Sequence, residues 1–143
     1  MPIIALDVGA KRIGVAVADP GGTFALPAAT IERTNLTADL KRIVEIAQSY
    51  DAADLVVGDP IALSGERGIA AQKMDAFVER LAAVFPGRIH REDERMTTAA
   101  ATKSLIAADV SRRRRKGAVD AMAAALILES FLARRRNAER RTP

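Results

Sequence analysis

Any chemistry performed by this sequence would rest on carboxylates. The chain contains one histidine, His90, and no cysteine, so a zinc cluster of cysteine and histidine ligands is excluded. Acidic residues instead stand where predicted strands end or helices begin, at Asp7, in the run 92–94, and at Asp120. Hard divalent ions such as Mg²⁺ take carboxylate, water and phosphate oxygens as ligands. Two such ions about 3.5–4 Å apart can activate a water for phosphodiester cleavage.

Each of these acids also has a purely structural interpretation. Asp7 would suit an Asx-type turn at the start of a hairpin. The acids of the run 92–94 would suit a solvated turn whose charges are offset by Arg91 and Arg95. Asp120 would be stabilised in the first turn of a helix by the helix dipole. Spacing alone leaves both interpretations open for each acid.

Asp120 nevertheless lies where a charged residue is unusual. The apolar run after Gly117 has a spacing of three and four residues, which predicts a helix. One face of that helix would carry Asp120, Ala123, Ala124, Ile127 and Phe131. The helix dipole explains an acid near the helix start, but it does not explain an acid on the apolar face.

Positive charge is concentrated in the C-terminal third of the chain. From Ser111 onward there are ten Lys and Arg against three acids, a net charge of +7, whereas the preceding residues hold twelve against fifteen, a net of −3. This asymmetry favours a polyanionic partner, either nucleic acid or an anionic membrane surface. The cations beside the candidate acids either form solvated loops or contact phosphates; they are Lys11, Arg12, Arg112, Arg113, Arg114, Arg115 and Lys116.

Composition limits the class of protein. A length of 143 residues with 49% hydrophobic residues indicates a single domain with a real core. The start MPIIALDVG has no basic leader, and the absence of cysteine is compatible with a reducing compartment. No uncharged apolar run is long enough for a membrane span. We therefore expect a soluble, cytoplasmic protein without a membrane partner. An aromatic content of 3% argues against base stacking and for recognition of backbone shape.

Hydrophobic periodicity predicts an α/β domain in which helices cover the faces of one mixed, five-stranded sheet. Strands are predicted over residues 3–8, 13–19, 24–31, 54–58 and 88–93. Helices are predicted over residues 37–50, 69–84, 97–109 and 117–135. We expect one domain over residues 1–135 and a basic, flexible tail over residues 136–143.

Four blocks of this sequence resemble the signature blocks of the YqgF/RuvX family. They are DVGAKRIGVAVAD (7–19), VVGDPIALSGERG (56–68), DERMTT (93–98) and VSRRRRKGAVDAMAAALIL (110–128). The blocks occur in the family order and span nearly the whole chain. Members of this family are described as pre-16S rRNA nucleases and as Holliday-junction-resolvase-like proteins with an RNase H-like fold.

The resemblance implies a metal-dependent nuclease, a phosphodiester hydrolase that uses Mg²⁺ or Mn²⁺, with a two-metal site suspected. Carried over block by block, Asp7, Glu94 and Asp120 would be both the catalytic residues and the metal ligands. In an RNase H-like sheet the first strand is central, so its end and the start of the last helix can meet. The cations before Asp120 would then hold the nucleic-acid backbone beside the metal site.

The block at 56–68 departs from the family pattern. Asp59 replaces an apolar residue, Ala62 an asparagine and Ser64 an aspartate. These changes put in question any substrate contact made by that loop. They also make Asp59 a possible additional ligand, and Asp93 remains a rival to Glu94.

Several functions remain open from the sequence. The first is processing of the 5′ end of precursor 16S rRNA during ribosome maturation. The alternatives are a Holliday-junction-type DNA resolvase, which would cut symmetrically as a homodimer, and a nucleic-acid-binding module without catalysis. Structured RNA and branched DNA are thus both candidate partners, and the protein could be a monomer or a homodimer. Phosphoryl transfer in a sugar-kinase or actin-like fold is a further possibility, but it needs two such domains.

Overall fold

The computed structural model describes residues 2–60, 65–94 and 112–141, with the side chains of 112–119 and 141 excepted. The predicted helix over 97–109 and the loop positions Ala62 and Ser64 lie outside the described residues. The strands are β1 (Ile3–Val8), β2 (Arg12–Ala18), β3 (Ala25–Glu32), β4 (Asp54–Asp59) and β5 (Arg88–Asp93). The helices are α1 (Leu36–Ser49), α2 (Ile69–Ala82) and α4 (Arg112–Arg141). Every predicted element within the described residues is therefore present.

The strands form one mixed sheet in the order β3-β2-β1-β4-β5. β1 pairs antiparallel with β2 and parallel with β4, and β5 continues the parallel part. β1 is thus the central strand. Its C-terminal end lies beside those of β4 and β5 because neighbouring parallel strands end at the same edge of the sheet.

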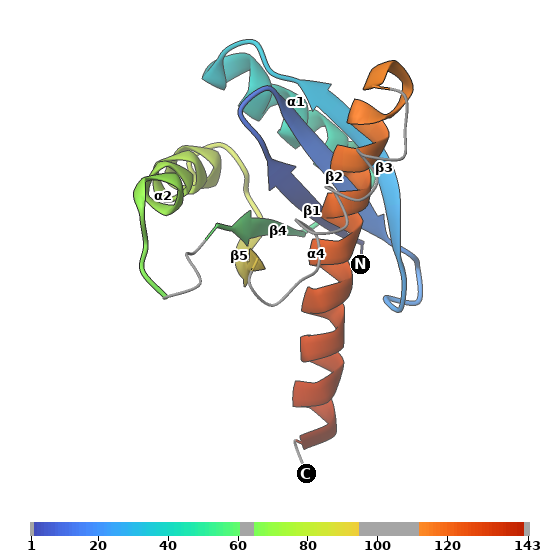
Figure 1. Cartoon of the computed structure of the whole chain (residues 1–143). Helices are drawn as coiled ribbons and strands as arrows, with labels where there is room; N and C mark the ends of the chain where they lie inside the picture. The colour runs from blue at the N-terminus through green and yellow to red at the C-terminus, as the bar shows by residue number, and fades with distance from the viewer. Residues whose placement is uncertain (1, 61–64, 95–111, 142–143) are drawn as a thin grey trace.

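The two faces of the sheet carry different helices (Figure 1). Ile4 and Leu6 of β1 join a core with side chains of α1 and α2. Ile3 and Ala5 face the other way and pack under α4. This alternation separates the molecule into an α1/α2 face and an α4 face.

Small residues let α4 lie close to the sheet. The core on this face contains three alanines of the helix, Ala123, Ala124 and Ala125, together with Ile127 and Leu128. Asp120 is 6% exposed, so the acid does lie on the buried side of the helix.

Helix α4 is longer at both ends than the predicted 117–135. It begins at Arg112 and continues to Arg141, so residues 136–141 of the predicted tail are helical. Arginine, alanine and glutamate are good helix formers. In addition, Arg135 Nε lies 4.0 Å from Oε1 of Glu139, one helical turn later. A charged sequence therefore need not end a helix that tertiary packing has already started. The domain limit at residue 135 stays a prediction.

Among the described residues, no helix combines the length and the apolar character needed to cross a bilayer.

Candidate active site

Asp7 occupies the centre of the candidate site, at the C-terminal end of the central strand. It is half-buried, and its backbone pairs with Gly14 of β2. On the other side of β1, Leu6 pairs with Val57 of β4, so Gly58 is the next residue beside Asp7. By strand alternation the Asp7 side chain lies on the α4 face. Asp7 is therefore flanked by two glycines, one on each neighbouring strand.

The start of α4 packs directly against the first glycine, Gly14. A Cβ atom at Gly14 would lie 1.9 Å from the backbone carbonyl oxygen of Asp120 and 2.9 Å from the backbone nitrogen of Ala121. The helix backbone thus rests directly on β2, a distance that only a residue without a side chain allows. This contact places Asp120 one strand away from Asp7.

The Glu94 side chain packs against the second glycine, Gly58. A Cβ atom at Gly58 would lie 3.0 Å from Glu94 Oε1 and 2.8 Å from Ile127 Cδ1 of α4. The Glu94 carboxylate therefore lies over the end of β4, on the α4 face and one strand from Asp7. The structure brings the three predicted acids to one face and one edge of the sheet, with Asp7 in the middle.

The three carboxylates are not gathered into a closed set of ligands. Within the described part of the chain, no group of three or more His, Asp and Glu side chains is close enough to hold a metal ion. With strands about 4.8 Å apart, the Asp120 backbone over β2 and the Glu94 carboxylate over β4 lie on either side of β1, roughly 10 Å from each other. The donor chemistry fits Mg²⁺ or Mn²⁺, since all three groups offer hard oxygens, and the two glycines provide the cradle.

Arg12 lies against the acid of the last helix. Its Nε donates a hydrogen bond of 3.0 Å to Asp120 Oδ2, and the Asp120 side chain is 9% exposed. The sequence proposed Arg12 as a phosphate contact, and the structure places it as a counter-ion of Asp120. Lys11 is exposed in the hairpin. The backbone of 112–116 is helical, and the side chains of these residues lie outside the described part.

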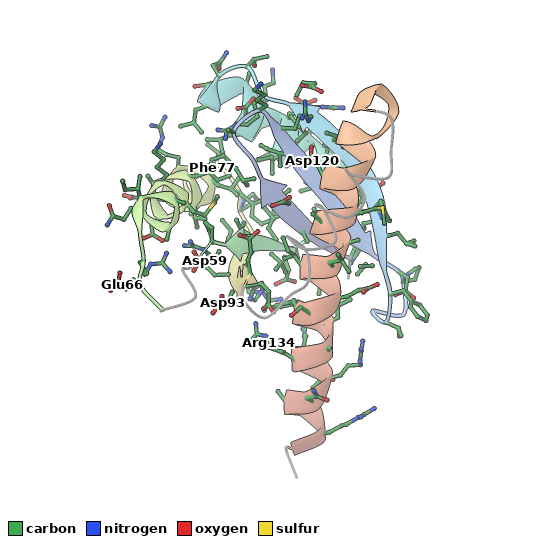
Figure 2. All side chains as sticks on the ribbon, in the orientation of Figure 1. Asp59, Glu66, Phe77, Asp93, Asp120 and Arg134 are labelled. Atoms are coloured by element: carbon green, nitrogen blue, oxygen red, sulfur yellow. The ribbon has the colours of Figure 1, made fainter. Side chains whose placement is uncertain are left out.

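Asp59, the proposed additional ligand, lies on the opposite face of the sheet (Figure 2). Arg67 donates to both of its carboxylate oxygens, at 2.7 and 3.2 Å, and Arg91 donates at 2.8 Å. Asp93 is the strand partner of Asp59 across β4 and β5. Since Gly58 and Glu94 belong to the α4 face, strand alternation assigns Asp59 and Asp93 to the α2 face.

The sequence interpretation missed the role of Glu92. A solvated turn was one of the two interpretations left open for the run 92–94, but Glu92 is 0% exposed. Ser130 Oγ donates to it at 2.7 Å and Arg134 Nε at 3.1 Å, with a second Arg134 contact through Nη2. These bonds tie β5 to α4 just before Glu94. The signal available in the sequence was the spacing of Ser130 and Arg134, one helical turn apart.

A second buried carboxylate, Asp54, lies at the opposite end of the parallel strands. It accepts hydrogen bonds from Arg88, at 2.9 and 3.2 Å, and contacts His90 Nε2 at 2.9 Å. Burial by itself would raise the pKa of Asp54, but the bonds from His90 and Arg88 outweigh burial and hold this pKa below its usual range.

The lowered pKa of Asp54 predicts a pH-dependent contribution to stability. Because the ionised form is favoured in the folded protein, its contribution is complete above about pH 4 and is lost as the pH falls below that value. We expect Asp54→Asn to lower the free energy of unfolding at pH 7 by about 2 kcal/mol. Urea unfolding at several pH values tests this, and a wild-type advantage that persists undiminished at pH 2.5 would contradict it.

Gly58 should matter more for activity than for stability. A methyl group at Gly58 would meet the ends of two side chains, Glu94 Oε1 and Ile127 Cδ1, and these can move. We expect Gly58→Ala to displace the Glu94 carboxylate and to lower cleavage at least about 10-fold, with a loss of stability of only about 1–2 kcal/mol. Parallel cleavage and thermal unfolding measurements test this expectation, which unchanged cleavage would contradict.

Comparison with known proteins assigns the chain to a family. The family model described as "RuvX: Holliday junction resolvase" matches residues 1–134. A protein of Moorella thermoacetica named "Putative pre-16S rRNA nuclease" is 45% identical over 134 residues, which cover 94% of this chain and 96% of that one. A protein of Desulforudis audaxviator with the same name is 42% identical over 137 residues, covering 96% and 97% of the two chains.

Solved structures support the fold. The RuvC protein of T. thermophilus, solved in complex with a Holliday junction substrate, matches with a TM-score of 0.59 and 16% identity, covering 94% of this chain and 96% of that one. The Holliday junction resolvase of fowlpox virus matches with a TM-score of 0.52 and 12% identity, covering 94% and 99%. The predicted RNase H-like α/β fold is confirmed.

Proposed function

Because the chain belongs to the RuvX family, we propose that it is a divalent-metal-dependent nuclease that processes the 5′ end of precursor 16S rRNA during ribosome maturation. Relatives named for this activity match 94–96% of the chain. The observation that carries the proposal is the position of Asp7 between two glycines, one under Asp120 and the other under Glu94.

In this proposal Asp7, Glu94 and Asp120 hold the metal ions. Bound Mg²⁺ or Mn²⁺ would supply activation of a water and stabilisation of the leaving oxygen. Asp7 has the central position and can share ions with a neighbour on either side. Arg12 neutralises the buried Asp120 carboxylate, and its remaining donors are available to a phosphate.

The nucleic-acid backbone would lie along the cations that surround the site. Lys11 is exposed on the hairpin that follows Asp7. The run 112–116 forms the first turns of α4, directly before Asp120. Cations at these points would contact phosphates on both sides of the cut bond. The proposed location of the reaction is the cytoplasm.

A second candidate is cleavage of branched DNA. The description of the matching family as a Holliday junction resolvase favours it. A resolvase would cut two strands symmetrically and so requires a homodimer, whereas an rRNA-processing enzyme can act as a monomer. A nucleic-acid-binding module without catalysis is the third candidate, which the open spacing of the carboxylates favours.

One assay separates these candidates. The pure protein is incubated with Mn²⁺ and either a precursor 16S rRNA fragment with its 5′ extension or a four-way DNA junction, and EDTA is added in the control. Cleavage of the RNA alone supports the proposal, and cleavage of the junction alone supports the resolvase. Binding that weakens steeply with salt, without cleavage of either substrate in Mn²⁺, would support the binding module and contradict the proposal.

A further inference from the structure

A group of exposed arginines lies beside the edge strand β5, two strands away from the central strand that carries Asp7. Arg88 begins β5, and Arg134 and Arg135 lie on the C-terminal half of α4. The side chains of Arg88, Arg134 and Arg135 are 73%, 53% and 49% exposed. They surround a hollow of about 330 Å³ whose lining includes His90 and Phe131. We call Arg88, Arg134 and Arg135 the distal arginine surface.

Buried carboxylates fix two of these arginines in place. Asp54, 4% exposed, accepts two bonds from Arg88, and Glu92, 0% exposed, accepts two from Arg134. A guanidinium has five N–H donors, so each arginine keeps donors beyond those two bonds. Because Asp54 and Glu92 are buried while the guanidinium groups of Arg88 and Arg134 are exposed, the outward side of these two pairs is positive; the partner of Arg135, Glu139, is itself exposed. Arginines held in this way lose little side-chain entropy when they bind a phosphate.

The lining of the hollow is partly apolar. The rings of His90 and Phe131 are tilted against each other with centroids 5.1 Å apart. Residues Phe131, Arg134, Arg135 and Ala138 all line the hollow from one face of α4, at a spacing of three and four. The surface is thus built on a strand and a helix, and no described loop contributes to it.

The separation from the candidate active site differs along this surface: Arg134 bonds to Glu92, two residues before Glu94, whereas Arg88 lies at the far end of β5. Along α4, Arg134 lies fourteen residues from Asp120, about 21 Å at 1.5 Å per residue (Figure 2). Along β5, Arg88 lies six residues before Glu94, about 20 Å at 3.3 Å per residue. At roughly 3 Å per base pair, the distance of about 20 Å between Arg88 and Glu94 corresponds to about six base pairs of a duplex.

We propose that the distal arginine surface binds the phosphate backbone of the substrate duplex about six base pairs from the cut. This inference rests on the proposed function, since it assigns the surface to the same substrate. It would orient the nucleic acid along the axis of α4, so that the helix that supplies Asp120 also determines the distance from a phosphate contact to the reacting bond.

The control for this inference is on the same helix. Arg136 and Arg140 do not line the hollow, and Arg136 Nη1 donates to the backbone oxygen of Thr23 at 3.3 Å. Arg140→Gln therefore removes one exposed charge from α4 without touching the distal arginine surface. Arg88→Gln with Arg135→Gln removes two charges from the surface and leaves the pair of Arg134 with Glu92 intact.

The test measures RNA binding in EDTA, so that cleavage does not interfere. The probes are fluorescent RNA hairpins carrying the same 5′ extension on a stem of about 20 base pairs or of about 4 base pairs. We expect the double variant to bind the long hairpin about 10-fold more weakly, with a slope of log K against log salt that is smaller by about 2. The short hairpin should bind wild type and variant equally, and Arg140→Gln should change either affinity less than about twofold.

The outcomes separate this inference from the proposed function. Equal binding of the long hairpin by wild type and double variant would overturn the inference, as would an equal loss in Arg140→Gln. If the double variant loses affinity only for the long hairpin but the wild type cuts no RNA with Mn²⁺, binding by the distal arginine surface is supported and the proposed nuclease function is contradicted. A double variant that unfolds is replaced by Arg135→Gln alone, for which the expected change in slope is about 1.

Discussion

Replacement of Asp7 by Asn is expected to abolish metal-dependent cleavage while the protein stays folded. Asp7 is the only one of the three acids that has a candidate ligand on each side, Asp120 over Gly14 and Glu94 over Gly58. Loss of its charge would therefore weaken metal binding across the whole site. We expect a decrease of at least about 1000-fold in cleavage rate, or about 4 kcal/mol in the activation free energy.

The size of this effect distinguishes catalysis from folding. Asn has nearly the shape of Asp, and Asp7 is only half-buried, so the melting temperature should change by no more than about 3 °C. Glu45→Gln is the matched control because Glu45 is an exposed acid on α1, on the other face of the sheet. Full activity of Asp7→Asn, or an equal loss in the control, would refute the assignment.

Replacement of Gly14 by Ala is expected to have the largest effect on stability. The new Cβ atom would lie 1.9 Å from the carbonyl oxygen of Asp120 and 2.3 Å from its carbonyl carbon. These are backbone atoms of a helix, which cannot yield without moving the whole of α4 away from β2. We expect a loss of about 3 kcal/mol or more, which corresponds to a decrease of about 10 °C in melting temperature, and a loss of cleavage because Asp120 moves.

Gly68→Ala provides the comparison. Gly68 precedes α2, and a Cβ atom there would have no neighbour within 4 Å. This variant should lose at most about 1 kcal/mol, the usual difference between glycine and alanine before a helix. If Gly14→Ala were as stable as Gly68→Ala and fully active, α4 could not rest on β2 as described.

The first strand and the last helix were predictable because each has a clear period. The side chains of β1 alternate between the two faces, and the apolar face of α4 repeats every three or four residues, so both strand and helix were placed correctly. The central position of β1 followed from the family resemblance rather than from periodicity. Order along the chain does not state which strands are neighbours.

The face of Asp59 was not predictable. β4 is buried on both sides, and all six of its residues are buried, so its sequence shows no alternation. Only the observed contacts, with Gly58 under α4 and Asp59 held by Arg67 and Arg91, separate the two faces.

Ion pairs between residues far apart in the sequence could not be predicted either. Arg12 and Asp120 are 108 positions apart, and Glu92 and Arg134 are 42 apart. A sequence shows that charges of opposite sign are present, but pairing depends on the distance between elements in space. For this reason the sequence left a solvated turn open for Glu92, and it predicted Arg12 as a phosphate contact without its pairing to Asp120.

The most direct test of the account is a crystal structure of the protein grown with Mn²⁺, with anomalous diffraction used to locate the metal. The account predicts Mn²⁺ bound by Asp7 together with Asp120, Glu94 or both, with ligand distances of about 2.0–2.4 Å. Mn²⁺ bound only elsewhere on the surface, or no Mn²⁺ at this edge of the sheet at a saturating concentration, would contradict it.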